Sequence, residues 1–115
     1  MKLYIAVLDE FPDYMTPTLV AHSMLAAHIK WFKFNYDDIL GYSEYMDWLQ
    51  NSFKKVTVRV NQKEFDKIAA LPDTYLGHEN STLEGRKSCA IPMPYRDDEV
   101  LPNVLKFAKL WKPKE

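Results

Sequence analysis

Two histidines, His22 and His78, are the side chains of this chain best suited to acid–base chemistry. Histidine changes its charge near neutral pH, so a pair at one site can move a proton. We expect both near the carboxyl end of the first predicted strand, where open α/β sheets usually bind ligands. A histidine on a helix flank or a short loop is more often only hydrogen-bonded or solvated, so both interpretations stay open.

Metal binding is not expected from the other acid–base side chains. His22 and His28 are six positions apart, which places them on different sides of a helix. The acidic loop with Asp9, Glu10 and Asp13 lacks the ligand spacing of a calcium loop, so a solvated loop is favoured over a cation site. Neither a metal ion nor a cofactor is predicted.

Two further groups of side chains indicate binding rather than catalysis. The basic group is Lys54, Lys55, Arg59 and Lys63 together with Arg86 and Lys87, and the candidate nucleic-acid contacts within it are Lys55, Arg59, Arg86 and Lys87. Such charges are more often ordinary surface. The aromatic group is Tyr36, Tyr42, Tyr45 and Trp48. Because one short helix and its entry loop cannot bury so many rings, we expect a surface for a protein partner or for a second copy of the chain there.

The composition limits the classes of protein to which the chain can belong. Its 115 residues suit one domain, spanning residues 1–115, and a hydrophobic content of 47% excludes the disordered class. The 15 basic and 16 acidic side chains nearly balance, so no overall field attracts nucleic acid. Cys89, the only cysteine, is most simply a small buried apolar residue. With no signal-like or membrane-spanning run, we expect a cytoplasmic protein.

A strand and a long helix at the start of the chain must position the candidate site. Residues 2–8 are almost continuously apolar, which is typical of a strand covered on both faces, and we expect this strand at the centre of a sheet. A helix is predicted from residue 16 to about residue 32, with Thr16 as N-cap and Pro17 in its first turn. Its apolar side, expected to pack closely on the sheet, is Val20, Met24, Ala27 and Trp31.

The remaining elements alternate between helices and strands. The predicted order is a short helix after Ser43, a strand at 53–60, a helix between Asn61 and Pro72, strands at 74–78 and 87–93, and a final helix from the acids at 97–99 to the lysines at 106–112. Asn61 and Glu64 form a close analogue of a capping box. Pro92 is expected to end its strand or to lie at a sheet edge.

This order predicts a three-layer α/β/α sandwich, with a four-stranded mixed sheet and helices on both of its faces. Helical crossovers join parallel neighbours, and the short turn between the last two strands joins antiparallel ones.

Two local segments within this layout resemble the type II peptidyl-tRNA hydrolases, a family of small cytosolic α/β/α domains of archaea and eukaryotes. Residues 15–26, Met-Thr-Pro-Thr-Leu-Val-Ala-His-Ser-Met-Leu-Ala, are similar to the family's Gly-Lys-Gly-Lys-x-Ala-Ala-Gln-x-x-His-Ala. Residues 78–82, His-Glu-Asn-Ser-Thr, are similar to its Asp-Ala-Gly-x-Thr. Only Ala21, Ala26 and Thr82 match outright, so the resemblance rests on a layout that covers nearly the whole chain.

The resemblance implies hydrolysis of the ester that joins a peptide to tRNA. In that reaction Thr82 would orient a water and His78 would act as base, with Thr18 and His22 in support. The sequence differs from the family's motifs at the positions expected to carry the chemistry. Threonines replace the basic residues before the family's helix, and Leu25 replaces its helix histidine.

Two functions therefore remain open. The first is a catalytically silent family-like protein that binds and modulates a component of the translation machinery, either tRNA or a tRNA synthetase, with a homodimer as a further expectation. The second is an active hydrolase of peptidyl-tRNA or of a related aminoacyl ester. The missing basic residues favour the first, and the extent of the shared layout keeps the second.

Overall fold

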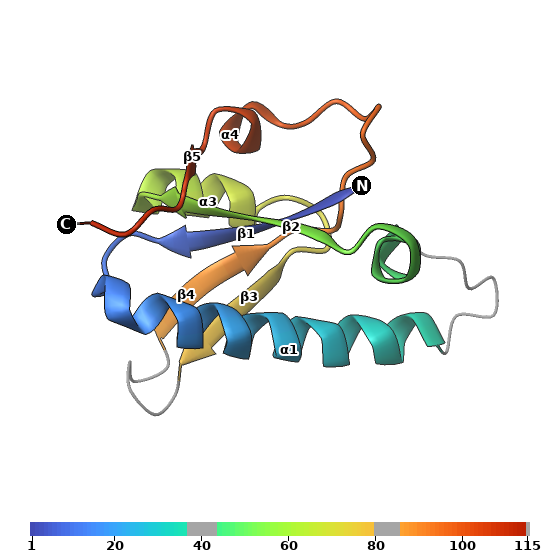
Figure 1. Cartoon of the computed structure of the whole chain (residues 1–115), viewed down its shortest axis with the longest axis horizontal. Coiled ribbons are helices and arrows are strands. Elements are labelled where there is room, and N and C mark those ends of the chain that lie inside the picture. Colours follow the sequence, from blue (N-terminus) through green and yellow to red (C-terminus); the bar gives the residue numbers. More distant parts are fainter. Residues whose placement is uncertain (37–43, 80–85, 115) are drawn as a thin grey trace.

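The computed structural model describes residues 1–36, 44–79 and 86–114 and shows an α/β fold (Figure 1). Its strands form one mixed sheet in the order β3-β4-β1-β2-β5. They are β1 (Lys2–Leu8), β2 (Lys54–Val60), β3 (Tyr75–Glu79), β4 (Arg86–Ile91) and β5 (Lys109–Leu110). The α-helices are α1 (Thr16–Tyr36), α2 (Glu44–Asp47), α3 (Gln62–Ala69) and α4 (Asn103–Lys106), and a π-helical turn, Trp48–Ser52, follows α2.

The first strand lies at the centre of the sheet, as its apolar run predicted. β1 pairs in parallel with β2, so that Lys2 lies beside Lys54 and Leu8 beside Val60. On its other side β1 pairs antiparallel with β4, which in turn pairs antiparallel with β3. The predicted mixture of parallel and antiparallel neighbours is therefore confirmed.

The prediction of four strands and a long final helix is wrong. The last helix, α4, covers only Asn103–Lys106, and the chain then extends to form β5 against β2. Beyond β5, the Trp111 N–H donates to the Thr57 carbonyl at 2.9 Å. The outer edge of β2 thus offers this segment backbone partners, and satisfying them outweighs its helical pattern. The expected charge–dipole arrangement is lost as well, because the acids at 97–99 precede α4 and lie in a turn.

Helix α1 lies over β3 and β4 along one face of the sheet (Figure 1). It runs to Tyr36, beyond the predicted end, and Thr16 is helical (φ −57°, ψ −46°) rather than an extended N-cap, because a 3-10 turn leads directly into the helix. Its buried row is Leu19, Ser23, Ala27 and Trp31. The helix approaches β3 so closely that a Cβ atom added to Gly77 would lie 2.0 Å from the Ser23 hydroxyl oxygen.

Helix α3 lies on the side of the strands opposite α1 (Figure 1). The predicted capping box is confirmed: the Asn61 side chain accepts from the Glu64 N–H at 2.8 Å, and the Glu64 carboxylate accepts from the Asn61 N–H at 2.9 Å. Phe65 and Ile68 form its buried side. No helix in the described ranges is both long and apolar enough to cross a membrane.

Candidate functional site

The residues that the resemblance assigned to catalysis do not form an enclosed site. Thr18 and His22 lie on α1 and His78 lies on β3, and all three side chains are exposed to solvent. The close packing of α1 on β3 brings together the elements that carry the two histidines. Thr82 lies outside the described residues. Ester hydrolysis is favoured by donors and bases in a water-excluded cavity, which these exposed side chains do not provide.

Arg59, a predicted phosphate contact, is instead held by carboxylates at the carboxyl ends of β1 and β2. Its guanidinium donates to both oxygens of Asp13, at 3.0 and 3.1 Å, and to Asp9 at 3.0 Å. The Lys114 ammonium also binds Asp9, at 2.8 Å, and the Lys114 N–H donates to Asp13. The segment after β5 therefore closes over this end of the sheet, where the two acids expected in a solvated loop are neutralised.

The other three predicted phosphate contacts are dispersed. Arg86 pairs with Glu10, and Lys87 is exposed on β4. The Lys55 ammonium lies 3.3 Å from the centre of the Phe53 ring, and burial lowers the pKa of Lys55. Together with Arg59, these residues do not present the continuous basic surface that the sequence suggested.

The Arg59 network makes stability depend on pH. Hydrogen bonds from Lys114 first, and from Arg59, lower the pKa of Asp9 below its usual 3.8, and a hydrogen bond from Arg59 is the main cause of the lowered pKa of Asp13. Carboxyls with lowered folded-state pKa values contribute stability above the unfolded-state pKa and lose it as pH falls through the folded-state values. We expect the urea midpoint to fall as the pH drops below about 4, and to fall less in Arg59→Met. An identical pH dependence in both proteins would contradict this origin.

Two of the predicted partner contacts belong to the core, so their assignment to a surface is wrong. Tyr45 is 0% exposed and Trp48 1% exposed. The Tyr45 hydroxyl lies 2.6 Å from His28 Nδ1, and burial raises the pKa of Tyr45 to about 12. The Trp48 indole donates to the Lys54 carbonyl at 2.7 Å. Of the other two predicted contacts, Tyr36 is the last residue of α1 and Tyr42 lies outside the described residues.

An exposed apolar surface does exist, but it lies on α1. Leu25, Ile29 and Phe32 are 62%, 61% and 40% exposed and follow a helical spacing of four and three. These three residues, here called the outer face of α1, lie on the side of the helix away from its buried row. The helix carries Lys30 and Lys33 and has no acidic residue.

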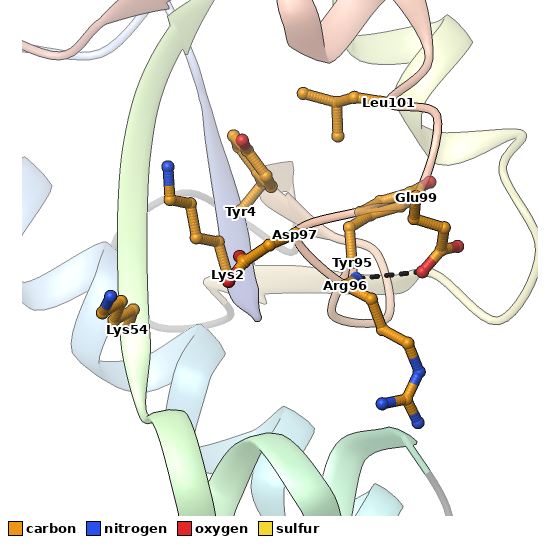
Figure 2. A pocket seen from close by; sticks show the side chains of 8 residues that line it. All are labelled: Lys2, Tyr4, Lys54, Tyr95, Arg96, Asp97, Glu99 and Leu101. Carbon is orange, nitrogen blue, oxygen red and sulfur yellow. Dashed lines mark hydrogen bonds between the residues drawn. The ribbon is translucent and has the colours of Figure 1, made fainter.

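A second feature, which sequence reasoning missed, is a hollow of about 350 Å³ at the amino ends of β1 and β2 (Figure 2). We call it the tyrosine–lysine hollow. Its lining residues are Lys2, Tyr4, Lys54, Tyr95, Arg96, Asp97, Glu99 and Leu101. Lys2 and Tyr4, two positions apart and so on one strand face, were a signal that this face is partly wet, but the segment at 95–101 that completes the hollow is distant in sequence.

The frame of the tyrosine–lysine hollow is fixed by backbone hydrogen bonds. The N–H and C=O of Lys2 bond the C=O and N–H of Tyr95, both at 2.9 Å. The Tyr4 and Tyr95 rings meet edge to face, with centroids 6.4 Å apart. Lys2, Tyr4 and Lys54 share one sheet face, because Lys2 is the register partner of Lys54 and lies two residues before Tyr4.

The acids of the tyrosine–lysine hollow already have partners. Asp97 pairs with the ammonium of Met1 at 3.1 Å, and Glu99 accepts from the Arg96 N–H at 2.9 Å. The Arg96 guanidinium binds Asp47 at 3.0 Å, outside the lining. The Met1 ammonium is the main cause of the lowered pKa of Asp97, followed by charge attraction from Lys54 and then Lys2.

Neither Lys2 nor Lys54 makes an ion pair within the described ranges. Both ammonium groups nevertheless lie near enough to Asp97 to help lower its pKa. No three metal-ligating side chains gather anywhere in the described part of the chain. A search of protein-family models finds none that matches this chain, and a search of curated proteins finds no match either.

Proposed function

We propose that this chain is a catalytically silent protein, similar in its three-layer α/β/α arrangement to the type II peptidyl-tRNA hydrolases, that binds and modulates a protein of the translation machinery. The observation that carries this proposal is the outer face of α1, where three large apolar side chains remain exposed in a row. The partner is a tRNA synthetase that offers an apolar groove with an acidic rim.

The chemistry of α1 supports this choice of partner surface. Apolar side chains at helical spacing are how a helix enters a groove on another protein. Exposing several large apolar residues together to water is unfavourable, and burying them in an interface removes this unfavourable free energy. Because no residue of α1 is acidic, an acidic rim around the groove would meet no like charge on the helix.

The positions of the predicted catalytic and phosphate-binding residues support the absence of hydrolase activity. His22, His78 and Thr18 are exposed, and the guanidinium of Arg59 is occupied by two carboxylates. The tRNA part of a peptidyl-tRNA substrate carries many phosphates, and two of the predicted phosphate contacts, Arg59 and Arg86, are already paired with carboxylates. The scaffold can thus be kept while its surface serves another purpose.

The proposal predicts that charge on the outer face of α1 weakens partner binding. Against a panel of purified tRNA synthetases, we expect one to bind the wild type and to bind Leu25→Asp or Ile29→Asp at least about tenfold more weakly, since central apolar contacts dominate such interfaces. Affinity would be measured by calorimetry. Phe107→Asp is the matched control, because Phe107 is 72% exposed and lies beside α4, away from α1.

Two results would contradict the proposal. One is a panel in which no synthetase binds, or in which Phe107→Asp weakens binding as much as Leu25→Asp. The other is cleavage of a peptidyl-tRNA surrogate by the purified protein that disappears in both His78→Ala and Thr82→Ala. That second result would establish the alternative, an active hydrolase of peptidyl-tRNA or a related aminoacyl ester.

A further inference from the structure

We propose that the tyrosine–lysine hollow binds a single nucleotide, with its phosphate between Lys2 and Lys54 and its base against Tyr4 and Tyr95. The hollow and the outer face of α1 use different parts of the surface, because the hollow is lined by residues of β1, β2 and the segment 95–101 and by no residue of α1. This inference therefore goes beyond the proposed function and does not depend on it.

The size of the hollow suits a ligand of this class. Its volume of about 350 Å³ is at the small end of the range for ligand pockets, about 300 to 1,000 Å³. One nucleotide fills such a space, whereas a folded partner or several residues of a peptide do not.

The two lysines provide a place for a phosphate. They lie opposite each other on neighbouring parallel strands, which are about 4.8 Å apart, so both ammonium groups can reach one phosphate. Their backbones are held: the Lys2 N–H and C=O bond Tyr95, and the Lys54 carbonyl accepts from the Trp48 indole. Lysine ammoniums that lack a protein carboxylate partner of their own are suited to a charged oxygen ligand.

The opposite wall provides a place for a base. The Tyr4 ring lies between Lys2 and the segment that carries Tyr95, and Leu101 borders it on another side (Figure 2). Both tyrosines are only partly buried, so ring surface remains for stacking. Stacking on aromatic side chains is the common sequence-tolerant contact to bases. Burial, and the nearby Glu99 and Glu44 carboxylates, raise the pKa of Tyr95, so its hydroxyl stays protonated and can donate a hydrogen bond.

A nucleotide fits better than an acidic peptide. A bound peptide would need hydrogen bonds to its own backbone, and the backbone groups at the frame of the hollow already bond each other across Lys2 and Tyr95. Arg96, which could otherwise bind a peptide carboxylate, already donates a hydrogen bond to Asp47.

The first test is calorimetric titration of the full chain with AMP, CMP, GMP and UMP at low salt. We expect all four to bind, and expect adenosine and ribose 5-phosphate each to bind at least about tenfold more weakly than AMP, because each lacks one of the two contacts. Equal affinity for AMP and ribose 5-phosphate, binding of an acidic peptide in place of AMP, or no binding of AMP would overturn the proposal.

Charge variants assign the binding to this hollow. We expect Lys2→Met and Lys54→Met to weaken AMP binding about fivefold or more, and Asp97→Asn to strengthen it, because the last removes the negative charge beside the phosphate. Lys63→Met, an exposed lysine on α3 outside the lining, is the matched control and should bind as the wild type does. All four positions are exposed, so circular dichroism is expected to show an unchanged fold. A loss in Lys63→Met equal to that in Lys54→Met would assign the binding to general charge and overturn the site.

A short RNA with and without a 5′-phosphate distinguishes the two sources of this ligand. Tighter binding of the phosphorylated RNA than of AMP supports an RNA end as the natural ligand. Binding no tighter than AMP supports a free nucleotide. Binding of both RNAs that does not change in Lys54→Met would place the RNA elsewhere and would contradict the assignment.

Discussion

Replacing Gly77 with alanine should lower the free energy of unfolding by about 3 kcal/mol, because overpacking at a rigid contact is costly. The added Cβ would lie 2.0 Å from the Ser23 hydroxyl oxygen and 2.7 Å from the Ser23 Cβ, well inside contact distance. Neither side can move easily, since Gly77 is in β3 and Ser23 belongs to the buried row of α1. Urea unfolding followed by circular dichroism would measure the effect.

A double-mutant cycle identifies the cause of that loss. Ser23→Gly removes both of the closest atoms and leaves the Ser23 Cα at 3.4 Å, a tight contact but one that small shifts can relieve. On its own it should cost about 0.5 kcal/mol of helix propensity, because glycine is a poorer helix former than serine. Combined with Gly77→Ala, we expect the double variant to be more stable than Gly77→Ala alone. Simple additivity of the two losses would show that the close approach of α1 to β3 is not what requires glycine.

Trp48→Ala should cost about 4 kcal/mol, the largest single loss expected from the cluster around α2. Trp48 is fully buried, its ring contacts those of Tyr45 and Phe53, and its indole donates to the Lys54 carbonyl. Alanine would leave a cavity and an unsatisfied carbonyl at the start of β2. Thermal and urea unfolding would both record the change.

Phe53→Ala is the comparison that separates the stability due to buried packing from that due to an exposed ring. Phe53 stacks on Trp48 but is mostly exposed, so we expect it to lose much less stability. If Trp48→Ala instead kept its stability and lost only the affinity for a protein partner, the sequence-based assignment of Trp48 to a partner surface would be correct, and the burial described above would not hold in solution.

The parts of the fold that depend on local pattern were predictable. The apolar run at residues 2–8 fixes a central strand, and Asn61 with Glu64 marks a helix start through contacts only three residues apart. The segment after α4 was not predictable in this way. Its amphipathic pattern favours a helix, but its backbone instead forms hydrogen bonds with the open edge of β2, a partner about fifty positions earlier in the chain.

The candidate site residues likewise divide into features that a local pattern reveals and features that depend on distant parts of the chain. A surplus of aromatic rings is visible in the composition, but whether Tyr45 and Trp48 are covered depends on α1 and β2 arriving from other parts of the chain. Arg59 likewise looks like a free cation in the sequence, because the acids that hold it come from a loop before α1. The tyrosine–lysine hollow joins β1, β2 and residues 95–101, so no single stretch reveals it.

The contacts made by the segment at 109–114 also determine when the domain can complete its folding during synthesis. Chains emerge from the ribosome amino end first, and a domain folds only when its parts are present. The bond between Lys114 and Asp13 joins positions 101 apart, and β5 is the strand that covers β2. While the ribosome is still adding these residues, β2 has an unpaired edge, and Asp9 and Asp13 lack their contacts to Lys114. The nascent chain therefore carries an open strand edge until residues 109–114 have left the ribosome, and during that interval it is most exposed to aggregation and most in need of chaperones.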